Sequence, residues 1–297
     1  MSDGRIPVVL FAFNRPAHLA RVLECLRGEH VPLVVVFADG ARGRSDVESV
    51  AAVRRALRAI DWCEVRLVER ETNLGLGRNV LAGVSEVAAA HEAFVVWEDD
   101  LVCVPGTYAW MSAALRRYAR DERVMSVSAW THPRVTPAEV GERPYFDRRA
   151  ECWGWGAWAR SWRGMTQETA WKKMKAAEAA GVAAGAYGED LPRMAREELR
   201  RNIWAVRWLY HHFQHGGLCV RPPWSMVEHI GFDAQATQAG DAIEWANPPL
   251  RSAPPIPAVW PEPGEHAACR GLWAAANPPG GWRGLAQRVW RKVRRTL

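Results

Sequence analysis

Short apolar segments alternate with segments of helical periodicity through the first third of the chain. Each apolar segment has the length of a strand and is rich in β-branched or aromatic residues, which is typical of strands buried on both faces. Each intervening segment carries apolar residues at three- and four-residue spacing, which indicates a helix with one buried face. This alternation predicts an α/β fold, in which helices cover both faces of a parallel sheet. The expected strands are residues 6–13, 31–38, 63–69 and 93–97, and the expected helices are residues 17–27, 45–60 and 77–91.

Polar residues follow three of these strands at the point where each strand ends. Because the carboxyl ends of parallel strands meet at one rim of a sheet, and ligands of such sheets bind beyond that rim, we expect these residues to lie together. They are Asn14-Arg15, Asp39-Gly40 and Glu98-Asp99-Asp100.

The rest of the chain has a different pattern. Four Trp and two Gly fall within residues 151–162, and a Pro-rich stretch over 247–263 excludes regular strands and helices there. We predict a domain over residues 1–240, with a first half at about 1–104 and a second at about 105–240, and a tail over 241–297. Further helices are expected at 105–120, 166–183 and 191–215, and further strands at 124–129 and 218–221.

The composition, 48% hydrophobic and 24% charged, is typical of soluble globular proteins. No run approaches the roughly 20 apolar residues of a membrane-spanning helix, the N-terminus lacks the pattern of a signal peptide, and the six Cys are scattered without a C-x-x-C pair. We therefore expect a cytoplasmic protein with reduced thiols.

The C-terminal residues 284–297 carry five of the cations behind the net charge of +6, with apolar residues at helical spacing. A basic amphipathic helix suits an anionic membrane surface, here the inner face of the membrane. The alternatives are a solvated terminal helix and a tail that packs on its own domain. Since the remainder is nearly neutral, the charge does not predict nucleic-acid binding.

The acidic triplet Glu98-Asp99-Asp100 indicates a cation site. Three acids after a buried strand are costly unless positive charge compensates them, and Mg²⁺ or Mn²⁺ binds oxygen ligands. The alternative is a solvated turn or a helix N-cap near Pro105. Asp39 at the rim can accept protons from a nucleotide base or ribose, or it can form an ordinary Asp-Gly turn.

A glycine-containing loop at residues 73–79 leads into the third expected helix. Gly75 and Gly77 permit close backbone approach, and a helix N-terminus favours anions. The loop fits neither the G-x-G-x-x-G nor the P-loop pattern, which disfavours a dinucleotide site and an NTPase. With Arg15 and Arg78 it indicates a site for a nucleoside diphosphate.

In these motifs and in their order, the sequence resembles the GT-A glycosyltransferases. Among them it is similar to N-acetylglucosaminyltransferase I and related bacterial sugar transferases. The resemblance spans roughly residues 6–235. It rests on PVVLFAFNRP (7–16), VVVFADG (34–40), NLGLGRN (73–79), VVWEDDLVCVPGTYAWM (95–111), Val127-Ser128-Ala129-Trp130, Cys152-Trp153-Gly154-Trp155-Gly156, WAVRW (204–208), Arg221-Pro222-Pro223-Trp224-Ser225 and IGFD (230–233).

The resemblance implies a GT-A fold, with a Rossmann-like, mainly parallel central sheet, and a role for each matching residue. Asp39 would bind the base, and Asp100 would ligate Mn²⁺ or Mg²⁺. Ser225 would lie in a loop that orders over the donor. The remaining donor-binding residues would be Asn14, Arg15 and Arg78 near the diphosphate, and Glu98 and Asp99 at the donor sugar and ribose.

The general base is the main departure from the family pattern. Trp204 and Trp208 enclose Ala205, Val206 and Arg207, with no acid between them, although transfer with inversion needs a carboxylate near the acceptor hydroxyl. Asp190, Glu197, Glu198 and Asp233 are candidates, and we favour Glu198 and Asp233 because they flank segments that match the acceptor side. Each is alternatively a helix-surface acid or a loop cap.

The acceptor is expected to meet Trp130, Trp153 or Trp155, because sugar faces stack on aromatic rings, although core packing is the alternative. The resemblance thus implies a metal-dependent, inverting hexosyl- or N-acetylhexosaminyltransferase. It would move a sugar, expected to come from a UDP-sugar, to a hydroxyl of a glycan or glycolipid in cell-surface polysaccharide synthesis. The alternatives are a sugar nucleotidyltransferase and a non-catalytic protein that binds nucleotide-sugars or carbohydrates.

Overall fold

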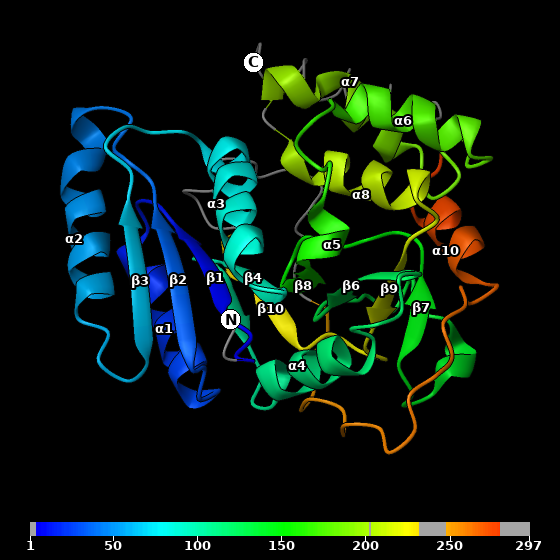
Figure 1. The fold of residues 1–297 in the computed structure, drawn as a ribbon, viewed down its shortest axis with the longest axis horizontal. Helices are drawn as coiled ribbons and strands as arrows, with labels where there is room; N and C mark the ends of the chain where they lie inside the picture. The colour runs from blue at the N-terminus through cyan, green and yellow to red at the C-terminus, as the bar shows by residue number, and fades with distance from the viewer. Residues whose placement is uncertain (1–3, 202, 232–247, 280–297) are drawn as a thin grey trace, which may run out of the picture.

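The computed structural model describes residues 4–201, 203–231 and 248–279 (Figure 1). Its N-terminal part follows the predicted alternation of strands and helices closely. Most boundaries lie within three residues of the expected ones. The elements are β1 (Val8–Ala12), α1 (Pro16–Gly28), β2 (Leu33–Ala38), α2 (Val47–Arg58), β3 (Glu64–Glu69), α3 (Leu76–Ala90) and β4 (Ala93–Glu98).

The sequence explains these elements directly. Every residue of β1 and β2 is buried, as expected for central strands covered on both faces. Helix α1 begins at Pro16, whose fixed φ suits the first helical turn, and it buries Leu19, Val22 and Leu26 at helical spacing. In α3, a side chain at Gly83 would lie within 2.9 Å of the rings of Phe11 and Phe37, so glycine allows this helix to pack against the sheet.

The central sheet has eight strands in the order β3-β2-β1-β4-β8-β6-β9-β7. The first four are parallel to one another, and β6 is parallel to β9. Strand β8 runs antiparallel between β4 and β6, and β7 is an antiparallel edge strand beside β9. The chain enters β2 on one side of β1 and returns to β4 on the other, so the strand order reverses at the carboxyl ends of β1 and β4. In open α/β sheets a ligand crevice lies at such a point.

Helices cover both faces of the sheet, as Figure 1 shows. Apolar side chains of α1 and α2 pack with one set of strand residues, together with α4. Side chains of α3 pack with the alternate set, together with Trp162 of α5. The predicted α/β architecture, with a mainly parallel central sheet and helices on both faces, is therefore confirmed.

The second half has more elements than the prediction, among them β7, α5 and α10. Residues 191–215 form two helices rather than one, and the Trp-rich segment contains a strand. Two short strands, β5 and β10, also pair in a separate antiparallel sheet. The elements are β5 (Leu101–Cys103), α4 (Thr107–Arg117), β6 (Val124–Ser128), β7 (Tyr145–Asp147), β8 (Trp155–Trp158), α5 (Ala159–Trp162), α6 (Ala170–Ala179), α7 (Asp190–Arg201), α8 (Trp204–Gln214), β9 (Leu218–Arg221), β10 (Val227–His229) and α10 (Cys269–Ala276).

The predicted tail is described in part. Residues 248–263 contain neither helix nor strand, which confirms the expected irregular stretch over this described range. Helix α10 packs beside β7, where Trp273 Nε1 donates a hydrogen bond to Asp147 Oδ2 at 2.7 Å (Figure 1). The basic segment 284–297 lies outside the described residues. In the part of the chain that is described, no helix has the length and apolar character that a bilayer span requires.

Candidate functional site

The acidic triplet lies where β1 and β4 end side by side. Strand β4 ends at Glu98, and Asp99 and Asp100 form the turn before β5. Asp99 Oδ2 accepts a hydrogen bond from the backbone N–H of Phe13 at 2.8 Å. Asp100 Oδ2 pairs with Arg15 Nη1, also at 2.8 Å. The structure thus brings together two of the predicted polar segments at the crevice of the sheet.

The negative charge of the triplet is only partly compensated. Burial raises the pKa of Glu98 well above its usual range, and the charges of Asp100 and Asp99 raise it further. Burial and the neighbouring Asp100 raise the pKa of Asp99 to about 7, against the effect of the hydrogen bond from Phe13. Because carboxylates are destabilised in this way when like charges share a poorly solvated site, the arrangement favours an additional cation.

Strand β10 brings His229 to the triplet. The Nε2 atom of His229 lies 3.6 Å from Asp100 Oδ1, and the N–H of Ile230 donates to the backbone oxygen of Asp100 at 2.8 Å. Burial lowers the pKa of His229, although Asp100 opposes the shift. The sequence reasoning did not include His229, yet the IGFD motif that carries part of the resemblance begins at the next residue.

Gly231 closes this side of the site. A β-carbon at Gly231 would overlap Asp100 Oδ2 and would lie 2.6 Å from Arg15 Nη1. No side chain other than hydrogen fits there without displacing the ion pair.

Asp100 fits a divalent cation that other ligands would complete. Its Oδ1 atom is buried and accepts no hydrogen bond from any described residue. No group of three or more His, Cys, Asp or Glu side chains within the described ranges is arranged to hold a metal ion by itself. Mg²⁺-type ions commonly bind through one or two carboxylates and take their other ligands from substrate phosphates and water. The donor set at Asp100 is consistent with that kind of site.

Asp39 connects the end of β2 to the glycine loop. Its Oδ1 accepts from the N–H groups of Gly40 and Leu74, at 2.9 and 2.8 Å, and its Oδ2 from Gly75 N and Asn73 Nδ2, at 2.9 and 3.1 Å. A carboxylate offers about four acceptor positions, and all four are occupied here. Asp39 therefore holds the glycine loop against the end of β2, and its expected role toward a nucleotide base stays a prediction.

Asn14 lies on the loop after β1, and Arg78 lies in the first turn of α3. Asn14 Nδ2 donates to Asp46 Oδ1 at 2.9 Å, and the exposed Arg78 donates through Nε to the oxygen of Leu74 at 2.8 Å. Asp46, which the sequence reasoning missed, also receives three hydrogen bonds from Arg42, and these bonds lower its pKa. Its position before α2 resembles that of any helix-start acid, so the sequence carries no specific signal for it.

Two of the three predicted acceptor tryptophans connect to the acidic triplet. The ring of Trp153 is partly buried and lies 5.2 Å from the ring of His229 and 5.3 Å from that of Trp130. Trp130 itself is 3% exposed. A contact path therefore runs from Asp100 through His229 to these two rings.

Trp155 belongs to the core instead. It is fully buried, and its ring lies 5.8 Å from Trp162, 5.8 Å from Trp204 and 5.2 Å from Trp208. Because strand β8 is inserted between β4 and β6, this side chain points into the packed face of the sheet. This is the core packing given above as the alternative to its predicted role at the acceptor.

Ser225 and Glu198 make structural contacts. Ser225 is 1% exposed and donates through Oγ to the oxygen of Val227 at 2.8 Å, so its loop is already packed. Glu198 is 4% exposed, pairs with Arg207, and accepts from the N–H of Ala170 at 3.1 Å. These bonds are those of a buried ion pair that caps α6. Asp233, the other predicted base, lies outside the described residues.

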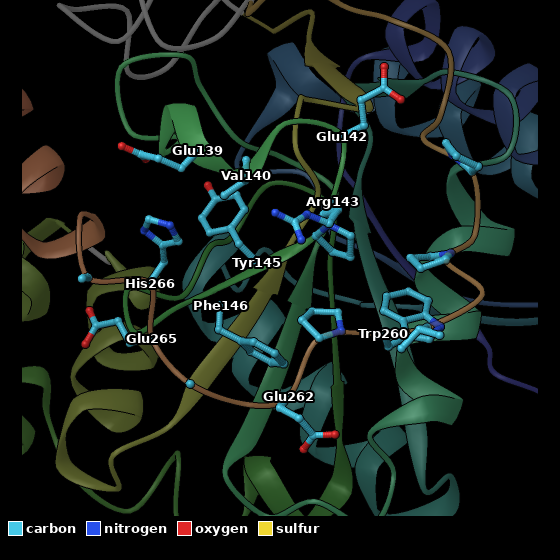
Figure 2. Close-up of a pocket in the computed structure, with 17 residues that line it drawn as sticks. Glu139, Val140, Glu142, Arg143, Tyr145, Phe146, Trp260, Glu262, Glu265 and His266 are labelled. Carbon is cyan, nitrogen blue, oxygen red and sulfur yellow. The ribbon is translucent and has the colours of Figure 1, made fainter.

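One large cavity lies apart from the acidic triplet. It has a volume of about 870 Å³ and lies between the segment that leads into β7 and the irregular tail. Figure 2 shows Tyr145, Phe146 and Trp260 on its walls, with glutamates around them. A second cavity, of about 320 Å³, includes Ser225 but none of the other predicted site residues. The candidate site is the rim around Asp100, where the acidic triplet, Arg15 and His229 meet.

Comparisons with known proteins find only distant structural similarity. Neither a protein-family model nor a curated protein matches it. One similar solved structure is mannosyltransferase PcManGT from Pyrobaculum calidifontis in complex with GDP-Man and Mn²⁺, with 16% identity, a TM-score of 0.40, and coverage of 55% of this chain and 46% of that one.

Two structures of S. aureus TarS are also similar, each with 13% identity and a TM-score of 0.39. The match to TarS 1–349 covers 54% of this chain and 48% of the TarS chain. The match to the other TarS structure covers 55% of this chain and 30% of the TarS chain. The chain thus spans less than half the length of each of these structures. A likeness at this level assigns neither a family nor an activity.

Proposed function

We propose that this chain is a metal-dependent glycosyltransferase that transfers a sugar from a nucleoside-diphosphate donor to a hydroxyl acceptor. The observation that carries the proposal is the acidic triplet at the point where the strand order reverses, next to Arg15. Its buried Asp100 Oδ1 accepts no hydrogen bond from any described residue. Carboxylates that favour a cation, beside a guanidinium suited to phosphate, are the groups that such a donor requires. The motif resemblance between residues 6 and 235 points to the same class.

The donor would be held by residues of the rim. Asp100 would hold Mn²⁺ or Mg²⁺, with His229 at its side, and the ion would supply positive charge to the diphosphate when bound. Arg15, Asn14 and Arg78 would lie along the diphosphate. Glu98 and Asp99 would accept hydrogen bonds from hydroxyl groups of the donor sugar and ribose. Positioned charges of this kind stabilise a leaving group without reorganisation during the reaction.

The acceptor would approach from the side of Trp153 and Trp130. Of the two predicted bases we retain Asp233, because it follows Gly231 by two residues and Gly231 lies against Asp100. The base would take the proton of the acceptor hydroxyl as that oxygen attacks the anomeric carbon, and the donor sugar would be transferred with inversion.

The finer identity is also a proposal. We infer a UDP-hexose or UDP-N-acetylhexosamine donor, and a glycan or glycolipid acceptor of cell-surface polysaccharide synthesis. The basic segment 284–297 would bring the enzyme to the inner face of the membrane. Deletion of that segment should weaken binding to anionic vesicles and leave donor hydrolysis unchanged. Equal vesicle binding by both forms would remove the membrane role.

The direct test is donor hydrolysis with Mn²⁺ across a panel of nucleotide-sugars, comparing wild type with Asp100→Asn. We expect the variant to lose roughly 100-fold in rate, because it removes the carboxylate that holds the cation. Asp61→Asn, at an exposed position after α2, is the matched control and should retain the wild-type rate. If Asp100→Asn retains both its hydrolysis rate and its nucleotide affinity, the proposal is wrong.

Two other outcomes would point to other functions. Release of pyrophosphate from a nucleoside triphosphate and a sugar phosphate would indicate a nucleotidyltransferase. Tight binding of a nucleotide-sugar without turnover across a broad acceptor panel would indicate a non-catalytic binding protein.

A further inference from the structure

Helix α1 is fixed at both ends against the chain segment that follows the acidic triplet. At its start, Arg15 pairs with Asp100 at 2.8 Å. At its end, Glu29 accepts hydrogen bonds from the N–H groups of Gly106, at 2.7 Å, and Tyr108, at 2.6 Å. Between these anchors α1 packs directly on β5. The two elements therefore run alongside each other with little freedom to separate.

Two thiols meet in the middle of this contact. Cys25 lies on α1, one helical turn before Glu29, and Cys103 is the last residue of β5. Both are free, both are partly buried, and both pack against the same core cluster. The Cys103 thiol donates a hydrogen bond to the Cys25 sulfur, and this bond lowers the pKa of Cys25 to about 6. The same bond, together with burial, raises the pKa of Cys103.

We propose that Cys25 and Cys103 form a redox modification site, at which a low-molecular-weight disulfide converts the two thiols into an intramolecular disulfide. The bridge joins α1 to β5. These elements carry, or directly adjoin, the two partners of the Arg15–Asp100 ion pair. Oxidation therefore locks the rim that holds Asp100 to the helix that holds Arg15. This proposal is independent of the function proposed above.

The chemistry balances in two exchange steps. The Cys25 thiolate attacks one sulfur of the small disulfide RSSR, which forms a mixed disulfide and releases RS⁻. The mixed disulfide removes the Cys25 thiolate, whose hydrogen bond is the largest cause of the raised pKa of Cys103. The Cys103 thiol then loses its proton, and its sulfur attacks the Cys25 sulfur and releases the second RS⁻. The protons of the two protein thiols end on the two released thiolates. In sum, two protein thiols and RSSR give one protein disulfide and two RSH.

The other thiols lack this combination of features. Burial raises the pKa of Cys63, and it also raises the pKa of Cys152 and Cys219. A thiol of raised pKa holds little thiolate at neutral pH, and the thiolate is the reactive form. Cys63 is the suitable control because, like Cys25, it is partly buried.

The pH profile discriminates better than a single rate. At pH 7 a thiol of pKa about 6 is roughly 90% thiolate, but its lower intrinsic nucleophilicity offsets much of that gain, which leaves an advantage of only a few-fold over an ordinary thiol. The pH at which the alkylation rate is half-maximal depends on the pKa alone and is not affected by the lower nucleophilicity. We expect Cys25 to reach half of its maximal alkylation rate below pH 7, and Cys63 only above pH 9.

The test is oxidation of the full chain with glutathione disulfide, followed by alkylation of the remaining thiols and peptide mapping. We expect loss of two of the six thiols, a Cys25–Cys103 linked peptide, and full reversal by dithiothreitol. Cys103→Ser should instead accumulate one glutathione on Cys25, because the second exchange step is blocked. Cys63→Ser should oxidise as the wild type does.

The mapping of wild-type protein keeps the test decisive even if a variant folds poorly. A different linked pair, six alkylated thiols after oxidation, or an alkylation midpoint of Cys25 near pH 9 would each overturn the proposal. Thiol loss that is unchanged in Cys25→Ser would overturn it as well.

Discussion

Replacement of Asp147 by Asn should destabilise the chain strongly, because it leaves a buried guanidinium with an incomplete partner. Arg221 and Asp147 are both fully buried, and Arg221 Nε lies 3.1 Å from Asp147 Oδ2. Burial lowers the pKa of Arg221, but Asp147 and the other acidic groups nearby outweigh burial and raise it overall. The protein therefore keeps this charge inside, and its partner offsets the desolvation cost.

The magnitude follows from what remains after the substitution. Removal of one partner of a buried pair costs about 3 to 5 kcal/mol. The amide oxygen of the introduced asparagine would still accept from Trp273, and Glu151 would remain 3.7 Å from Arg221, so we expect a value near the lower limit, about 3 kcal/mol. With an unfolding entropy of roughly 2.1 cal/mol/K per residue over 297 residues, this lowers the Tm by about 5 °C.

The assay is equilibrium unfolding in urea, followed by tryptophan fluorescence and circular dichroism. Glu64→Gln is the control, since its pair with Arg5 is solvent-exposed and should contribute less than about 1 kcal/mol. The double variant Asp147→Asn/Arg221→Met should recover part of the loss, because no unpaired charge remains buried. The reasoning fails if Asp147→Asn costs less than about 1 kcal/mol, or if the double variant is less stable than Asp147→Asn alone.

Three further predictions address other parts of the chain. His212 is fully buried, and burial holds its pKa well below 6.5, so the folded state loses stability as the pH falls below the pKa of the unfolded state. Between pH 7 and pH 5, the unfolding free energy of His212→Phe should therefore fall by about 2 kcal/mol less than that of wild type. Equal losses in the two proteins would contradict this. Gly231→Ala should weaken Mn²⁺ binding at least tenfold in a calorimetric titration, because the added methyl group displaces the Asp100–Arg15 pair. Unchanged affinity would mean that Gly231 does not contribute to the site. Glu198→Gln should lower the unfolding free energy by about 3 kcal/mol through loss of its pair with Arg207, and the rate of donor hydrolysis per folded molecule should not change. A lower hydrolysis rate at wild-type stability would instead support a catalytic role.

The first half of the fold was predictable because its signals are local. Strands β1, β2 and β4 are buried over most or all of their length, so each appears as an apolar run of strand length. The position of Glu98-Asp99-Asp100 at the sheet rim follows from the same runs. The carboxyl end of β4 must adjoin that of β1 once the strands are parallel neighbours.

The second half was less predictable because its strands depend on distant partners. Strand β8 has only four residues, Trp-Gly-Ala-Trp, and it pairs with β4 and β6 across gaps in the sequence that no local pattern reveals. We expected Trp155 at the acceptor, with core packing as the alternative. The strand brings this side chain into the core.

Individual side-chain roles were harder still. An Asp after a buried strand has the same sequence signature whether it faces a ligand or holds a loop. Only the positions of Leu74 N, Gly75 N and Asn73 Nδ2 reveal that Asp39 holds the loop. In the same way, β10 places His229 beside Asp100 only through its pairing with β5, which involves residues more than 100 positions apart.

The charges of the rim differ in kind from the other buried charges described here. Arg221 pairs with Asp147, Glu198 with Arg207, and Arg149 with Asp190, so each contributes to folding at little electrostatic cost. The acidic triplet sets three carboxylates against Arg15 and a histidine whose pKa is lowered by burial. This excess of negative charge does not help the chain to fold, since neutral side chains at these positions would give a more stable protein. A group of carboxylates that costs stability at one rim is a physical mark of a binding site. The cation and diphosphate of the proposed donor would supply the missing charges and ligands.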